Sequence, residues 1–319
     1  MYKLFLILSL FGIASTSGIA STYGSKCSEK KIEERDILYW IANPANLIDP
    51  TTKNCSEKFL ANFSKYHNSI SSLGPYLWKP NVINSSHVSV IPTPNVANNC
   101  YNELINKYPY LTLAASGGIS ECWNNNCEAK VMGRNPDFFI NSLSNFIQQF
   151  PTHISDVWFD FETKYINSND TININTLFNK LSQSVSVYRY AGCVHNGEPA
   201  YLNETCKDFT VNAPRVVVQG AGTYWDNSPI GFKKIFLDMV SDIGTENINR
   251  LSVAVCPCCD NYDQITQEEL YDRMDMLCEY NITSISAFTL DEILQLYGVN
   301  NTGGRWMNAF AYYKTGIKQ

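Results

Sequence analysis

The feature that most constrains the fold is a regular alternation of strand-like and helix-like segments along almost the whole chain. Short apolar runs typical of buried strands occur at residues 37–41, 72–78, 111–115, 156–161, 185–188, 215–219, 251–255 and 284–288. Segments with helical character lie between them, at residues 55–66, 99–107, 136–150, 175–184, 231–243 and 267–280. Strands that alternate with helices are parallel, and about eight such units in a chain of 319 residues predict a (β/α)8 barrel.

An open, doubly wound parallel sheet is the alternative architecture. It would carry a glycine-rich phosphate-binding loop after an early strand, and the sequence contains no such loop. Hydrophobic residues make up 45% of the chain, which is enough for a sizeable core and excludes disorder as the main state. We find no internal repeat and no low-complexity linker, so we expect one barrel domain over residues 23–319.

Residues 1–22 have the pattern of a secretory signal peptide. One Lys precedes an apolar run from Leu4 to Ala14, and Ser-, Gly- and Ala-rich sequence follows. A buried N-terminal helix is the alternative interpretation. The run is too short for a stable membrane anchor, and no later stretch is long and apolar enough, so we expect no membrane span in the mature chain. We therefore expect a secreted protein or one in the lysosomal or endomembrane lumen.

Cysteines and glycosylation sequons agree with an oxidising compartment. The chain has 11 cysteines, so most should form disulfides and at least one should remain unpaired or bond another molecule. Our local pairing predictions are Cys122 with Cys127 and Cys193 with Cys206. Asn-x-Ser/Thr acceptors, which predict a glycoprotein, occur at Asn54, Asn62, Asn84, Asn169, Asn203, Asn281 and Asn300.

The closely spaced Cys256, Cys258 and Cys259 could instead bind zinc. Zinc sites usually need a second pair of ligands at suitable spacing, and the four histidines are scattered along the chain. We therefore expect disulfides here, with no metal and no cofactor. The formal net charge of -6 gives no attraction to phosphate groups, so we expect no nucleic-acid partner.

The segment of residues 154–162 carries the strongest chemical pattern. Alternate strand residues share a face, so Asp156, Trp158, Asp160 and Glu162 should point into the barrel. Asp160 and Glu162 come last, at the end of the strand where barrel enzymes place their active sites. They lie about 7 Å apart along the strand. Burying two carboxylates together raises the pKa of one, which suits a general acid; a structural strand-end pair is the alternative.

These residues resemble the fourth strand of glycoside hydrolase family 18, the chitinase-type barrels, which reads Asp-Gly-x-Asp-x-Asp-x-Glu. Asp160 and Glu162 match its last Asp and its Glu, whereas Trp158 and Ser155 stand at the two earlier acids. Three further segments resemble the third, sixth and eighth strands of the family: Ser116-Gly117-Gly118, Gln219 followed by Tyr224, and Phe288. We expect Gly117 and Gly118 to serve the backbone conformation of the strand end.

The resemblance implies substrate-assisted, retaining hydrolysis next to N-acetylglucosamine in chitin-like polymers or N-glycans. Glu162 would protonate the glycosidic oxygen, and Asp160 would hold the substrate's acetamido group. Candidate substrate-binding residues are Tyr224, Gln219, Trp40, Trp78, Trp225 and Phe288.

Two rival functions remain open. A non-catalytic chitinase-like lectin would bind glycans through the same aromatic residues; Trp158 favours it, whereas Glu162 favours an enzyme. A muramidase-type barrel is the other rival, but the acid motif that it should carry on its first strand is absent between Ile37 and Pro44.

Overall fold

A computed structural model describes residues 26–27, 35–94, 97–119, 127–161, 168–185, 188–194, 214–221, 229–257, 265–295 and 302–319. Eight parallel strands form a closed barrel, because β1 pairs with both β2 and β9. The barrel strands are β1 (Asp36–Ile41), β2 (Ser72–Asn84), β4 (Thr112–Ile119), β5 (Asp156–Phe161), β6 (Tyr188–Val194), β7 (Arg215–Ala221), β8 (Leu251–Val255) and β9 (Ser284–Ala287). The prediction of a (β/α)8 barrel is confirmed.

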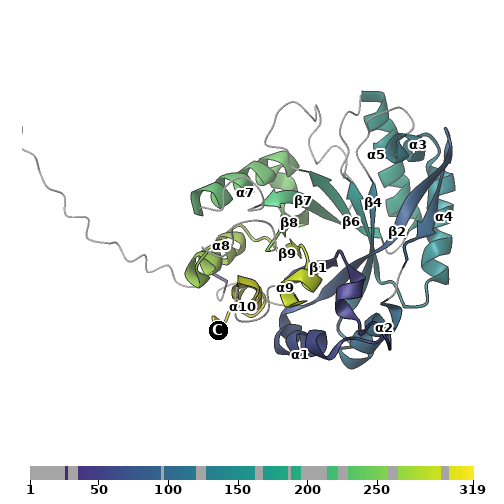
Figure 1. The fold of residues 1–319 in the computed structure, drawn as a ribbon. Helices are drawn as coiled ribbons and strands as arrows, with labels where there is room; N and C mark the ends of the chain where they lie inside the picture. The colour runs from purple at the N-terminus through teal and green to yellow at the C-terminus, as the bar shows by residue number, and fades with distance from the viewer. Residues whose placement is uncertain are drawn as a thin grey trace, which may run out of the picture.

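Helices surround the strands (Figure 1). They are α1 (Glu57–Tyr66), α2 (Asn98–Lys107), α3 (Glu128–Arg134), α4 (Pro136–Gln149), α5 (Ser168–Ser184), α7 (Pro229–Ile243), α8 (Gln267–Glu279), α9 (Leu290–Gln295) and α10 (Thr302–Thr315). Short 3-10 helices occur at Pro44–Leu47, His67–Ser69 and Thr245–Arg250. Local sequence fixes several starts: the Ser56 hydroxyl caps α1, and Thr266 and Glu269 form a capping box at α8.

The core has two parts, divided by the barrel wall. Side chains on the outer face of the strands, such as Val157 and Phe159, pack against the helices in one large cluster. Inside the barrel a smaller cluster contains Leu38, Trp40, Ala114, Trp158, Val217 and Ala254, with Phe288 against it. The alternation predicted for the acid strand is therefore confirmed for residues 157–159.

β2 is longer than expected and leaves the barrel as one arm of a hairpin. After its last pairing with β4 it continues to Asn84, turns, and pairs antiparallel with β3 (His87–Pro92). Val88 and Val90 of β3 belong to the outer core, and the Ser142 hydroxyl of α4 accepts a hydrogen bond from the Val90 amide. The hairpin is thereby anchored on α4.

Two disulfides join described cysteines, Cys27–Cys278 and Cys55–Cys100. Cys127 and Cys256 are disulfide-bonded as well, which argues against zinc at Cys256. Within the described ranges, no group of His, Cys, Asp or Glu could hold a metal ion. The predicted pairs Cys122–Cys127 and Cys193–Cys206 both include a residue outside the described ones.

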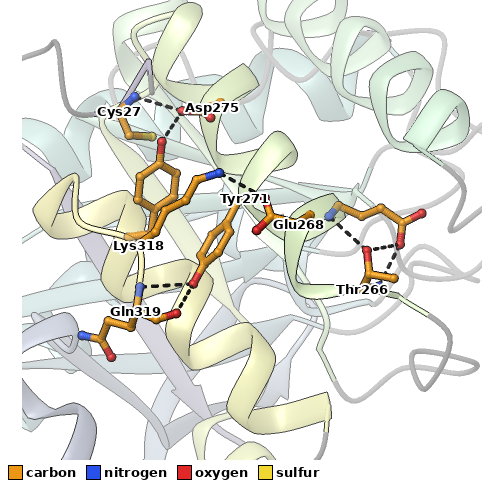
Figure 2. Close-up of polar contacts among 9 residues, drawn as sticks. Cys27, Thr266, Glu268, Tyr271, Asp275, Lys318 and Gln319 are labelled. Atoms are coloured by element: carbon orange, nitrogen blue, oxygen red, sulfur yellow. Dashed lines mark hydrogen bonds and ion pairs between the residues drawn. The ribbon is translucent and has the colours of Figure 1, made fainter. Parts of the chain in front are cut away.

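Helix α8 makes hydrogen bonds and an ion pair with residues from the N-terminal and C-terminal parts of the described chain (Figure 2). Asp275 accepts hydrogen bonds from the Cys27 amide and the Tyr312 hydroxyl. The Tyr271 hydroxyl donates to the Gln319 carbonyl at 2.8 Å, and Lys318 pairs with Glu268 at 3.1 Å. Among the helices that the structure describes, none is long and apolar enough to cross a membrane.

Candidate active site

A cavity of about 160 Å³ opens at the C-terminal end of the barrel strands. The ends of β1, β2, β4, β5 and β9 form it through Trp40, Ile41, Ala42, Gly74, Tyr76, Ser116, Trp158 and Phe288. Residues 120–126, 162–167 and 222–228, which directly follow β4, β5 and β7, and residues 258–264, which follow β8 after two intervening residues, lie outside the described residues. The described part of the cavity is mainly aromatic and is located where barrel enzymes bind their substrates.

Three aromatic side chains fill the barrel beneath the opening. Trp158 is fully buried, and its ring contacts that of Trp40 edge-on. Trp40 also contacts Phe288, with ring centroids 5.3 Å apart and an interplanar angle of 78°. Trp40 and Phe288, which the sequence suggested as sugar-binding residues, therefore lie together at the cavity, and Trp158 lies with them.

The proposed catalytic pair is only partly within the described structure. Asp160 lies near the end of β5, two residues beyond Trp158, and its backbone is in register with Gly118 of β4. Gln219 of β7 is in register with Val194 of β6. Glu162, Tyr224 and Trp225 lie outside the described residues, so their roles remain predictions.

Trp78 is not at the cavity, and the prediction that it binds sugar is wrong. Strand alternation would give Trp78 the same face as Tyr76, but the pairing of β2 with β4 shifts register between them. Trp78 consequently faces the outer core, fully buried, where its indole packs against Phe139 and Phe159. Its indole nitrogen donates a hydrogen bond to the Ala115 carbonyl at 3.2 Å.

Packing explains Gly117 better than backbone conformation does. Among the described glycines, only Gly244 and Gly316 have positive φ, so Gly117 and Gly118 do not need a glycine-specific conformation. A Cβ on Gly117 would overlap the Trp78 indole, whereas one on Gly118 would come within 3.1 Å of the Tyr76 ring. The expectation of a conformational role is therefore corrected to one of close approach by aromatic rings.

Tyr76 and Ser116 are cavity residues that the sequence reasoning did not select. The signal was available for Tyr76, because it follows Gly74 by two residues on the strand and so shares its inward face. Tyr76 is 36% exposed, which leaves part of its ring available to a ligand. Ser116 is buried, and its hydroxyl donates to the Gly74 carbonyl at 3.4 Å, which gives it a structural contact.

Asp291, in α9, fixes the segment that follows β1. Its fully buried carboxylate accepts hydrogen bonds from the Ala42 amide at 3.1 Å, the Asn43 amide at 3.3 Å and the Asn46 side-chain amide at 3.1 Å. Burial raises the pKa of Asp291 above its ordinary value, and these hydrogen bonds offset part of that effect. Because Ala42 lines the cavity, Asp291 helps to hold one wall in place.

Comparisons with known proteins give structural relatives only. No protein-family model matches the sequence, and no curated protein matches it. A class V chitinase from Nicotiana tobaccum, solved in complex with NAG4, superposes with a TM-score of 0.60 at 9% identity, covering 89% of this chain and 100% of that one. A family 18 chitinase from Crocus vernus gives 0.52 at 12% identity, covering 80% and 92%.

The spore cortex-lytic enzyme SleL of Bacillus megaterium also matches, with a TM-score of 0.57 at 10% identity, covering 81% of this chain and 71% of that enzyme. At such identities the similarity concerns the fold. The closed eight-stranded barrel and these superpositions agree. This chain therefore has the fold of the family 18 chitinases.

Proposed function

We propose that this protein is a glycoside hydrolase that cleaves bonds next to N-acetylglucosamine, in chitin-like polymers or N-glycans. The observation that carries the proposal is the aromatic cavity at the C-terminal end of the barrel. Trp158 of β5 lines this cavity, and Asp160 belongs to the same strand. Flat apolar ring faces suit the apolar faces of sugars, so Trp40, Tyr76 and Phe288 are proposed to contact the substrate. Tyr224, Gln219 and Trp225 are proposed to contribute from the end of β7 and the segment after it.

The proposed mechanism needs one acid and one orienting carboxylate. Glu162 donates a proton to the glycosidic oxygen as the bond to the anomeric carbon breaks. The carbonyl oxygen of the substrate's own acetamido group attacks that carbon, and Asp160 accepts a hydrogen bond from the acetamido N–H. Water then adds to the anomeric carbon as the bond from that carbon to the acetamido oxygen breaks. The water gives a proton to Glu162, which restores the acid, and the two displacements together retain the configuration.

A lectin is the second candidate, and Trp158 favours it. The resemblance to family 18 places an acid at this position, but the structure has a buried indole there, in contact with Trp40. A site with one carboxylate fewer has less means to tune the pKa of Asp160 and Glu162. Such a site could bind a glycan without cleaving it.

Purified protein tested against labelled chito-oligosaccharides and N-glycans, with cleavage and binding scored separately, distinguishes the two functions. Glu162→Gln keeps the shape of the side chain and removes the acid, so it should slow hydrolysis about 10²- to 10⁴-fold with little change in affinity. Asp160→Asn should also slow turnover. It should weaken a thiazoline mimic of the cyclised intermediate more than it weakens the plain oligosaccharide.

Glu57→Gln is the matched control, because Glu57 is an exposed carboxylate at the start of α1. It should leave hydrolysis unchanged. Full hydrolysis by folded Glu162→Gln protein would show that the acid is assigned wrongly. Binding without cleavage at every pH would establish the lectin instead.

We also propose that the protein is secreted or enters the endomembrane lumen through residues 1–22. The Cys27–Cys278 and Cys55–Cys100 disulfides support this, since disulfides persist in oxidising compartments. Mass spectrometry of protein expressed in a secreting cell should find a chain that begins near residue 23. Retention of residues 1–22 in the secreted product would contradict the proposal.

A further inference from the structure

The N-terminal end of the barrel, opposite the candidate active site, contains a second hollow of about 500 Å³. Four strands contribute their first residue to it, namely Asp36 of β1, Thr112 of β4, Asp156 of β5 and Arg215 of β7. Ser71 and Tyr110, which lie just before β2 and β4, line it as well. This end of a barrel usually serves stability, but the hollow has the size of a small-molecule site.

Arg215 offers hydrogen-bond donors to this hollow. Its Nη1 donates to the Asn249 carbonyl at 2.6 Å and to the Thr283 hydroxyl at 2.9 Å, which holds the guanidinium in place. Within the described part of the chain, Nε and Nη2 make no hydrogen bond and Arg215 makes no ion pair. A fixed guanidinium with uncommitted donors is ready to bind oxygen atoms of a ligand.

Asp36 and Asp156 add acceptors to the same hollow. Both are half-buried, and their backbones are held by strand pairing, Asp36 with Ser284 and Asp156 with Ala114. Carboxylates accept hydrogen bonds, and a guanidinium donates them. Hydroxyl groups do both, so a ligand with several hydroxyls can use all three side chains through charge-assisted hydrogen bonds.

Tyr110 gives the hollow an aromatic wall. Its hydroxyl donates to the His67 carbonyl at 2.8 Å and lies 2.7 Å from His67 Nδ1, so the ring orientation is fixed. The side chain is nevertheless 49% exposed. A fixed, exposed aromatic ring beside polar groups is suited to a ligand with one apolar face and a polar edge.

We propose that this hollow is a second carbohydrate site, which binds a sugar ring. The ring packs on Tyr110, its hydroxyls donate to Asp36 and Asp156, and its oxygen atoms accept from Arg215. This site is separate from the candidate active site, since the two lie at opposite ends of the barrel strands. The proposal therefore does not depend on hydrolysis.

The Arg215 Nε–H signal in a proton–nitrogen NMR spectrum tests the proposal at the site itself. The signal is assigned by its loss in Arg215→Lys. Glucose and N-acetylglucosamine are the probes, and glycine tests for a zwitterion instead of a sugar. We expect a saturable shift with at least one sugar. Its Kd should rise about tenfold or more in Tyr110→Ala, which lacks the ring.

Tyr110→Phe is the matched control, because it keeps the ring and removes only the hydroxyl; its Kd should stay within about threefold of the parent value. Asp156→Asn should also weaken binding, and it replaces Tyr110→Ala if that variant does not fold. A signal that does not respond to either sugar would overturn the proposal. So would an unchanged Kd in folded Tyr110→Ala and Asp156→Asn, or a response to glycine alone.

Discussion

At the residue scale, we expect replacement of Gly117 at the rim of the barrel to have the most direct effect on the free energy of unfolding. Its missing side chain makes room for the Trp78 indole, which is fully buried and cannot move into solvent. Gly117→Ala should therefore lower the free energy of unfolding by about 1–3 kcal/mol, the usual cost of overpacking. Urea denaturation measures this loss.

Gly118→Ala is the control for that experiment. The three atoms nearest to its Cβ would all belong to the side chain of Tyr76, which is partly exposed, at 3.1 Å or more. We expect a change of about 0.5 kcal/mol or less. Equal losses in the two variants would contradict the packing argument.

Asp291 should make stability depend on pH in a defined direction. Its pKa is raised in the folded protein, so the folded chain holds this proton more tightly than the unfolded chain does. The free energy of unfolding should consequently fall as pH rises above the ordinary value of 3.8, until the carboxyl is ionised in both states.

Asp291→Asn removes that titration and also loses acceptor capacity toward Asn43 and Asn46. The variant should be less stable than the parent, and the difference should be larger near pH 4 than at neutral pH. Chemical denaturation of both proteins across this range measures it. A difference that grows as pH rises would contradict the direction of the pKa shift.

At the residue level, the sequence predicted side chains on regular strands better than those next to irregularities. Trp40 and Phe288 are at the cavity as alternation and strand-end position suggested. Trp78 is not, because a register shift between β2 and β4 turns it to the other face, and no local residue pattern signals that shift. Tyr76 could have been found by applying the same alternation from Gly74.

Helix α3 is short and contains one residue of a buried ion pair, so we expect its stability to depend on that pair. It has only 7 residues, and Lys130 within it pairs with Asp170 of α5 at 3.2 Å, with the side chains 7% and 11% exposed. Lys130→Met leaves a buried carboxylate without this cation. It should lower the free energy of unfolding by about 3–5 kcal/mol in a denaturation experiment.

The pair of Lys180 and Asp137 provides the comparison. It joins α5 to α4 at 2.7 Å, but its side chains are 39% and 69% exposed. Lys180→Met should therefore cost only about 0–1 kcal/mol. If both lysine variants lost the same stability, burial would not be the reason for the difference.

The order and type of the main elements were predictable, since each has a strong periodicity. The helix expected at residues 136–150 is α4, and that expected at residues 267–280 is α8. Missed elements include the short α3, the β2–β3 hairpin and α10. Val82 and Ile83 extend β2 into partly exposed positions, so their pattern lacked the apolar run of a buried strand. The hairpin packs against α4, which is distant in sequence, so it depends on tertiary contacts and not on a local residue pattern.

At the scale of the whole molecule, the two described disulfides close loops of very different size. Cys27 and Cys278 are 251 residues apart, whereas Cys55 and Cys100 are 45 apart. Replacing both cysteines of a pair by Ser should cost about 2–5 kcal/mol, with the longer loop costing about 1.5 kcal/mol more if chain entropy dominates. Thermal or urea unfolding of the two double variants tests this. A larger loss for the Cys55–Cys100 pair would contradict the entropic account.

The Cys27–Cys278 bond also determines how the molecule would respond to force. If Cys27 and Gln319 were pulled apart in an optical trap, tension would pass through the disulfide directly to Cys278. Only the segment after Cys278, with β9, α9 and α10, could then extend, at about 3.3–3.6 Å per residue. The strands from β1 to β8 would bear no load along the chain. Adding a reductant would expose them to it, so the measured extension would lengthen several-fold.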